Sequence, residues 1–439
     1  MMTDWSPSPA SAPLHLRNVR VVDVVAGTTG APVAVTIHGG RIASIGSDGP
    51  APEGAMEIDC TGGCLIPGLF DCHTHLGFLS IGDAAERSGE LKDYVSRGVL
   101  YARDVGSPIE VISAMKRDID SGAAPGPEIF YTGPMLESEP LAWEKTNERL
   151  PGFTVAVNCE AEARRLLPEL ARQGAVMIKT FNNIPLSLYR TIVAVAADNG
   201  LRIVHDPGAP LFNLVPIHRA MELGVTSIEH AKAPWPHVLV DGLRERHDRL
   251  VDENGDPDQR RRLMMEIAAA GLGGVSEERL RNLAAEMAAR DVLLCPTLHV
   301  FDEMEEDGAE ATSTEEQGRR RARATLKEIS GFFVEKLAGY GVPFLVGSDS
   351  CSAAGCGREM RLMGGKGVST IEILRGATLY PARWLGVDDL LGSIAPGKRA
   401  DLVLLERDPL EDIDRLADIS MVVQRGMVVC MRTGIQPAS

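Results

Sequence analysis

Two histidines one residue apart, His73 and His75, lie in the stretch LIPGLFDCHTHLG, at the end of an apolar run. Side chains two residues apart on a β-strand point to the same face, about 6.5 Å apart along the strand, so both imidazoles can reach one metal ion. The pair alone fits equally well two histidines with ordinary hydrogen bonds in a core or at a surface. The rest of the sequence has to distinguish a metal site from a structural pair.

Short apolar strands alternate with helical stretches from Cys64 onward, a pattern that indicates βα units. Eight strands are predicted, at residues 64–75, 99–106, 128–136, 176–181, 201–208, 226–231, 292–300 and 343–350. Eight βα units predict an α/β fold, the (β/α)8 TIM barrel, in which chemistry collects at the C-terminal ends of the strands.

Six side chains that could do chemistry stand at these predicted strand ends, and we expect them to converge on one rim: His73, His75, Lys179, His205, His230 and Asp349. Each has an ordinary alternative, such as a hydrogen-bonded core histidine or an aspartate that caps a helix. Lys179 is the hardest to explain in that way, because a lysine in an apolar strand must find a partner or lose its charge. Six independent structural explanations would have to coincide at one end of the barrel, so a functional site is favoured.

Four imidazoles and one carboxylate are suitable ligands for Zn²⁺. One catalytic ion takes three protein ligands and a water molecule, so the surplus favours a second ion about 3.5 to 4 Å away with a bridging anion. If burial neutralises Lys179, its amine can add CO2 and form a carbamate, which has two oxygens and a negative charge. We therefore expect two divalent metal ions, Zn²⁺ by preference, and a CO2-derived carbamate on Lys179.

Composition excludes several other classes of protein. The net charge of −16, without a segregated basic patch, argues against nucleic acid and anionic membranes as partners. The first residues resemble no secretion signal, and no run of about 18 apolar residues is present. Eight cysteines without a C-x-x-C pair indicate reduced thiols. We expect a cytoplasmic enzyme with a small-molecule substrate.

The two ends of the chain have similar strand-and-turn patterns. We predict a tail over residues 1–12, a β-sandwich formed by residues 13–63 and 387–439, and the metal-binding barrel over residues 64–386. The charged stretch after the sixth strand, residues 241–271, is interpreted as a lid, a subunit contact of a homo-oligomer, or a solvated helical hairpin.

Over nearly its whole length the sequence resembles the amidohydrolase superfamily. The matching motifs are PGLFDCHTH, HDPG, IEHA, GSDS and GSIAPGKRADLVLLERDPLEDI, together with the lysine of the fourth strand. The stretches GVLYARDVGS, GPEIFYTGP and TIEILRGAT are similar to its imidazolonepropionase-related and prolidase-like branch.

This resemblance implies roles for the six residues. His73, His75 and Asp349 would hold one ion, His205 and His230 the other, and carboxylated Lys179 would bridge them. A hydroxide shared by both ions would be the nucleophile, and Asp349 would take its proton and pass it to the leaving amine.

Lys179 distinguishes two branches of such enzymes, since mononuclear deaminases and imidazolonepropionase lack this lysine. The stretch EHAKAPW also has no H-x-x-E, and strand alternation is expected to turn Glu229 away from the metals. These features favour a binuclear amidohydrolase that cleaves an amide or peptide bond, in a dipeptide or an N-acyl amino acid. An ester, lactone or organophosphate hydrolase, a mononuclear cyclic-amidine hydrolase or deaminase, and a non-catalytic relative stay open as alternatives.

The substrate pocket is expected to lie among the loops that follow the strands. Candidate contacts are Arg103, Tyr131, Trp143, Lys232, Trp235 and His299. Arg103 or Lys232 can bind a substrate carboxylate, although a structural ion pair explains each equally well. The stretch AKAPWP lacks the tyrosine that prolidase-like enzymes place after the histidine of strand six, which argues against proline dipeptides.

Overall fold

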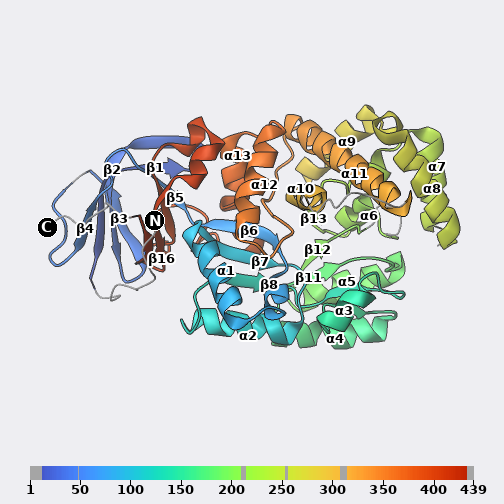
Figure 1. Cartoon of the computed structure of the whole chain (residues 1–439), viewed down its shortest axis with the longest axis horizontal. Helices are drawn as coiled ribbons and strands as arrows, with labels where there is room; N and C mark the ends of the chain where they lie inside the picture. The colour runs from blue at the N-terminus through green and yellow to red at the C-terminus, as the bar shows by residue number, and fades with distance from the viewer. Residues whose placement is uncertain (1–11, 48, 209–213, 253–255, 307–313, 433–439) are drawn as a thin grey trace.

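A barrel of parallel strands forms the body of the computed structural model, and a smaller sheet lies at one end (Figure 1). The structure describes residues 12–47, 49–208, 214–252, 256–306 and 314–432. The barrel strands are β6 (Leu69–Thr74), β7 (Val99–Asp104), β8 (Glu128–Tyr131), β9 (Met135–Glu137), β11 (Met177–Thr180), β12 (Arg202–His205), β13 (Ser227–Glu229) and β14 (Leu293–Cys295). The predicted (β/α)8 TIM barrel is confirmed.

Two runs of parallel pairing make the barrel wall. One has the order β6-β7-β8, and the other has the order β10-β9-β11-β12-β13-β14, where β10 is Thr154–Ala156. The segment after Pro343 closes the ring as the eighth strand, because Phe344 pairs with Leu294 and Ser350 pairs with Thr74. All eight predicted strand regions therefore contribute to the wall, with β8 and β9 sharing the third region.

Helices follow the strands and cover the outside of the barrel. They are α1 (Ala84–Ser96), α2 (Ile109–Asp120), α3 (Glu144–Arg149), α4 (Glu160–Arg172), α5 (Leu186–Asp198), α6 (Ile217–Glu222), α9 (Glu277–Ala289), α12 (Ala354–Gly365), α13 (Thr370–Gly376) and α14 (Leu379–Leu385). Short 3-10 turns are η1 (Leu76–Ser80), η2 (Trp235–Val238), η3 (Gly271–Gly274), η4 (Pro409–Glu411) and η5 (Ile413–Ala417). Many of the helices end at a glycine that follows the last turn with a positive φ, such as Gly98, Gly200 and Gly386.

The smaller sheet combines strands from both ends of the chain, as their blue and red colours show (Figure 1). Its strands are β1 (Leu14–Asp23), β2 (Thr28–His38), β3 (Arg41–Gly46), β4 (Met56–Asp59), β5 (Cys64–Pro67), β15 (Leu402–Leu405), β16 (Ile419–Gln424) and β17 (Met427–Met431). They hydrogen-bond as one eight-stranded sheet, which is the β-domain that the sequence predicted from both ends of the chain. The predicted strand 64–75 is divided at Gly68, so that β5 joins this sheet and β6 joins the barrel.

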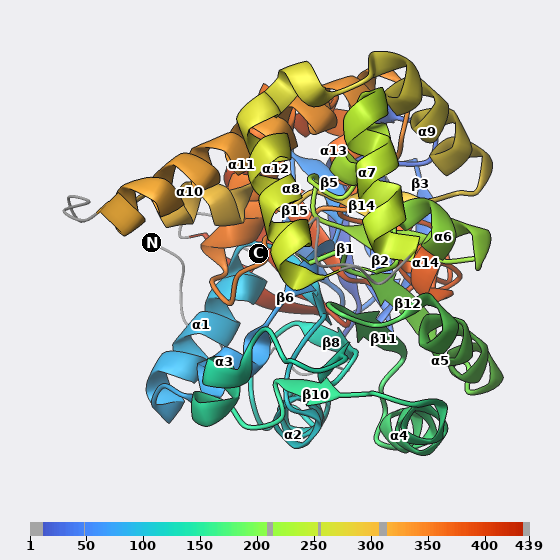
Figure 2. The ribbon, with the colours of Figure 1, turned by 90° about the vertical axis from the view of Figure 1, so that its right-hand side faces the viewer.

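Four further helices follow the last strands of the barrel. The charged stretch after β13 forms α7 (Asp241–Asp252) and α8 (Pro257–Ala270), and α10 (His299–Glu306) and α11 (Thr314–Gly339) follow β14. Two of them, α7 and α8, lie at the end opposite the small sheet (Figure 1 and Figure 2). Among the described residues, no helix is both long enough and apolar enough to cross a membrane. All eight cysteines are free thiols.

Candidate metal centre

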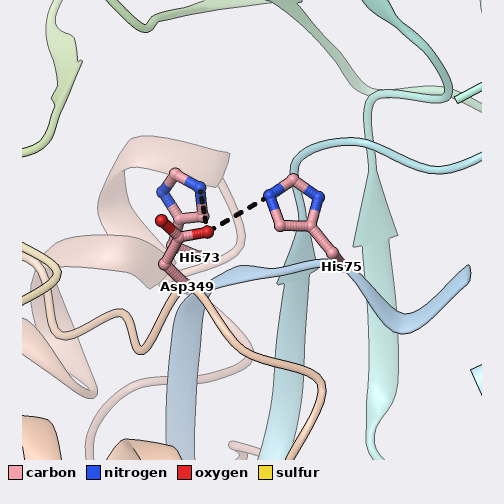
Figure 3. Close-up of side chains that lie close together, drawn as sticks. All are labelled: His73, His75 and Asp349. Carbon is pink, nitrogen blue, oxygen red and sulfur yellow. Dashed lines mark ion pairs between the residues drawn. The ribbon is translucent and has the colours of Figure 1, made fainter. Parts of the chain in front are cut away.

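Two imidazoles and one carboxylate meet at the C-terminal end of the barrel (Figure 3). Asp349 Oδ1 lies 3.3 Å from Nε2 of His75 and 3.4 Å from Nε2 of His73. The three ligand atoms of this group lie within 4.8 Å of one another. The structure thus brings together His73, His75 and Asp349, as the sequence predicted.

Hydrogen bonds at the far side of each ring fix which nitrogen carries the proton. His75 Nδ1 lies 2.8 Å from the carbonyl oxygen of Gly106, and His73 Nδ1 lies 2.7 Å from Glu229 Oε2, so both Nδ1 atoms donate. In the neutral form of the rings, which is the form that binds a metal, both Nε2 lone pairs face the Asp349 carboxylate. Lone pairs and a carboxylate repel one another unless a cation lies among them, so the donor set fits a divalent metal ion.

Burial and neighbouring charges suit these groups to metal binding. Burial, aided by the charge of Lys179, lowers the pKa of His73 well below its usual value, so the ring is neutral at neutral pH. Burial alone would raise the pKa of Asp349, but His73, His230 and His75 outweigh it and hold that pKa below its usual range. His73 is therefore neutral and Asp349 ionised, and these are the forms in which the two residues bind a metal.

The backbone holds Asp349 against the first barrel strand. The Asp349 amide donates to the carbonyl of His73 at 2.8 Å, and Asp349 itself adopts a left-handed conformation with φ of 54°. Asp71, on β6, accepts hydrogen bonds from both the amide and the hydroxyl of Ser348. These bonds join the loop after the eighth strand to β6 and fix the carboxylate beside the two histidines.

A second group lies beside the first and consists of Lys179, Asp206 and His230. Asp206 Oδ2 lies 3.0 Å from Lys179 Nζ and 3.0 Å from His230 Nε2. Lys179 Nζ is also 3.3 Å from His73 Nε2, and His230 Nδ1 is 3.8 Å from Asp349 Oδ2. The two groups therefore form one continuous site, and it contains Asp206, which the sequence analysis overlooked.

His205 does not join this site, contrary to the expectation from the sequence. Its ring is fully buried outside the barrel wall, with Nε2 3.1 Å from the carbonyl oxygen of Val215 and Nδ1 3.0 Å from the Tyr189 hydroxyl. The strand register explains this orientation. Lys179 pairs with Val204, and paired residues of parallel strands share a face, so His205 points outward and the next residue, Asp206, points inward.

Glu229 also corrects an expectation, because it points into the barrel. It is fully buried and contacts His73, Arg103 and Ser227 at 2.7, 2.7 and 3.0 Å. Strand alternation was expected to turn it away from His230, but His230 has a φ of 68°, so the strand ends there and both side chains face inward. Glu229 orients His73 from below the metal centre.

Arg103 belongs to the same interior layer and is not placed to bind substrate. Its side chain has 0% exposure, and it donates to the Cys72 carbonyl, the Ser227 hydroxyl and Glu229. The expected contact with a substrate carboxylate is therefore not supported, because Arg103 already neutralises a buried glutamate. Its contribution is to hold the Glu229 carboxylate that orients His73.

The other predicted substrate contacts fall into two groups. Tyr131 donates its hydroxyl to the Gln173 carbonyl on the outer side of the barrel, and His299 is buried at the start of α10. Trp143, Lys232 and Trp235, in contrast, line a cavity of about 520 Å³. The structure supports a substrate contact only for these last three.

Glu137, at the end of β9, is another buried carboxylate that the sequence analysis did not select. Its Oε2 accepts from the amide of Ala142, while Oε1 has no hydrogen-bond partner among the residues that the structure describes. Burial raises its pKa to about 7, and the charge of Asp206 adds to this effect while Lys179 opposes it. Glu137 therefore lies within electrostatic range of the second group of the centre.

Glu359 and two other buried carboxyls give the fold a predictable dependence on pH. Burial raises the pKa of Glu359 from 4.5 to about 8, that of Glu137 to about 7 and that of Asp71 to about 6. The folded state binds these protons more tightly than the unfolded state. Their stabilising contribution is thus complete below pH 4 and is lost as the pH rises through the folded pKa values.

We predict that the Glu359→Gln variant, which cannot ionise, loses less stability than the wild type between pH 5 and pH 8. The measurement is the melting temperature as a function of pH, with the exposed Glu278→Gln as control. One of the two backbone amides bonded to Glu359, those of Leu298 and His299, loses its acceptor in the variant, so its stability at pH 5 should fall. Parallel pH profiles for variant and wild type would contradict the prediction.

The sequence of this chain is similar to those of known proteins. Residues 313–429 match the model of the Amidohydrolase family. The chain is 25% identical over 393 residues to an imidazolonepropionase from Erwinia tasmaniensis, covering 84% of this chain and 85% of the relative. It is 28% identical over 404 residues to an imidazolonepropionase from Anaeromyxobacter dehalogenans, covering 84% and 83% of the two chains.

Solved structures share the whole architecture. A Xaa-Pro dipeptidase with bound methionine in its active site has a TM-score of 0.72 at 19% identity, covering 95% of this chain and 99% of the other. The ochratoxinase of A. niger has a TM-score of 0.70 at 18% identity, covering 97% of each chain. Both similarities establish the fold that the strand pattern predicted.

Proposed function

We propose that this chain, which matches the Amidohydrolase family model over residues 313–429, is a metal-dependent hydrolase of that superfamily and cleaves the amide bond of a small molecule. The convergence of His73 Nε2, His75 Nε2 and a carboxylate oxygen of Asp349 is the observation that carries the proposal. Zn²⁺ is the ion that best matches two imidazoles and one carboxylate. The chemistry supplied at such a site is Lewis acidity, which lowers the pKa of water and polarises a carbonyl group.

The residues of the chain supply the proton transfers. Asp349 is ionised at neutral pH and lies next to three imidazoles, so it can accept a proton from water and return it to the leaving nitrogen. His75 and His73 are held in the required tautomer by Gly106 and Glu229. No acidic residue lies within three residues after His230, which favours hydrolysis of an amide over deamination.

A second ion is part of the proposal, with Lys179, Asp206 and His230 as its residues. Carboxylation of Lys179 would replace its ammonium group, now 3.0 Å from Asp206, with an anion. Two anions at that separation repel each other unless a cation lies between them. Carboxylation and binding of the second ion are therefore linked, and each is expected only in the presence of the other.

We predict that Lys179→Gln reduces the metal content from two ions per chain to one and lowers kcat about 100-fold, since the bridging group is lost. Metal analysis after growth with zinc and bicarbonate measures the first effect. Lys145→Gln, at an exposed lysine in the first turn of α3, serves as the control. A variant that keeps two ions and full activity would refute the bridging role of Lys179.

The proposed function is tested by a hydrolysis screen of the zinc-loaded protein against N-acyl amino acids, dipeptides, aryl amides, lactones and aryl esters. We expect amides to be cleaved and chelation to abolish cleavage, with recovery after zinc is restored. Cleavage of esters or lactones alone would replace the amide assignment. A protein that binds no metal and cleaves none of these compounds would refute the proposal as a whole.

A further inference from the structure

An apolar cavity of about 520 Å³ opens beside the metal centre. Its walls come from segments far apart in the sequence, namely the loops after β9 and β11, the turn η2, and the helices α8 and α11. The main lining side chains are Trp143, Phe181, Trp235, Met264, Ile267 and Leu326. The stretch after β13, which the sequence analysis interpreted as a lid, a subunit contact or a solvated hairpin, thus contributes one wall of this cavity through α8.

Lys232 and Phe181 connect this cavity to the metal centre. Lys232 lines the cavity, and the charges of Asp206 and Asp349 act on it, although burial lowers its pKa overall. The ring of Phe181, also in the lining, lies 5.9 Å from Lys179 Nζ. A ligand group in the cavity is therefore next to the atoms that would react.

The polarity of the lining restricts what can bind. Lys232 is the single charged residue among the described lining residues, and no arginine is present there. Burial of an aromatic ring against such a surface favours binding. The cavity thus favours a large uncharged group over the charged end of a dipeptide.

We infer that the substrate is an amide with a bulky apolar group, aromatic or of similar size, and that this group binds in the cavity between α8 and α11. The inference rests on the proposed function, because the ligand is a substrate only if the protein hydrolyses amides. The binding of the apolar group is a separate property of the cavity and can be measured without turnover.

The test compares N-methyl-2-naphthamide with N-methylacetamide as ligands of the zinc-loaded protein, by isothermal titration. We expect the naphthamide to bind at least 10-fold more tightly. Ala268→Trp and Ala322→Trp fill the cavity from α8 and α11 and should abolish this difference, whereas Ala269→Trp, on the exposed side of α8, should preserve it. Two filling variants on different helices guard against loss of folding in one of them.

Each result decides between the alternatives. Equal binding of the two amides, or naphthamide binding that survives both filling variants, would overturn the inference even if other amides are hydrolysed. Tight binding that both filling variants abolish would support it even if no amide is cleaved, and in that case the proposed function alone fails. When cleavage is observed, kcat/KM for naphthoyl over acetyl amides should fall at least 10-fold in the filling variants.

Discussion

The Asp349→Asn variant is expected to fold normally, to lose about 1,000-fold in kcat and to bind its metal more weakly. The carboxylate lies 3.3 to 3.8 Å from nitrogen atoms of His75, His73 and His230, and it is the one anion of the first group. An asparagine side chain keeps the shape but removes both the charge and the capacity to accept a proton. Asparagine also tolerates the left-handed backbone at this position, where φ is 54°.

Asp291 provides a matched control for this substitution. It is an exposed aspartate with nearly the same backbone conformation, φ of 53°, so Asp291→Asn makes the same chemical change in the same local geometry. Metal content, kcat and melting temperature of the control should equal those of the wild type. Normal turnover of Asp349→Asn, with metal still bound, would show that another group transfers the proton.

The barrel could be predicted from the sequence because each strand carries its own apolar pattern. The eight strand regions were recognisable one at a time, and the rule that chemistry collects at strand ends selected His73, His75, Lys179, His230 and Asp349, together with His205. The first five each contact at least one other member of the metal centre. Residues of this kind need only the position of a strand end to be located.

Which face a side chain occupies depends on more than the local pattern. The stretch IVHDPG offers both a histidine and an aspartate, and the pairing of β12 with β11 decides which of them enters the barrel. Glu229 was misplaced for a related reason, since a positive φ at His230 interrupts the alternation. Register and backbone turns arise from tertiary contacts, which one sequence does not display.

Burial of charged groups was equally hidden in the sequence. The positive charge of Arg103 suits a residue that binds a substrate carboxylate. In the structure, however, its side chain is buried and donates hydrogen bonds to Glu229 and to the Cys72 carbonyl. Its role follows from the need to neutralise a glutamate inside the barrel. Trp143 and Trp235 could be proposed from the sequence as substrate contacts. The apolar character of their cavity could not, because its walls include helices from distant parts of the chain.

The sequence predicted His205 as a ligand of the second ion, whereas the structure places Asp206 at that position. Substitution of each residue distinguishes the two assignments. We expect Asp206→Asn to lose the second ion and at least 100-fold in kcat, because its carboxylate joins Lys179 and His230. Burial would raise the pKa of Asp206, but His230 and Lys179 outweigh it and keep the group ionised. Loss of that charge leaves Lys179 without its anionic partner.

His205→Gln should instead keep two ions per chain and most of the activity. The glutamine amide can still donate to Val215 and accept from Tyr189, two of the three partners of the histidine ring, and the third is the Thr180 hydroxyl. The main cost is therefore a lower melting temperature. Metal analysis of both variants at equal zinc and bicarbonate concentrations measures the difference. If His205→Gln lost an ion while Asp206→Asn kept both, the strand would have to rotate when metal binds, and the ligand set expected from the sequence would be correct.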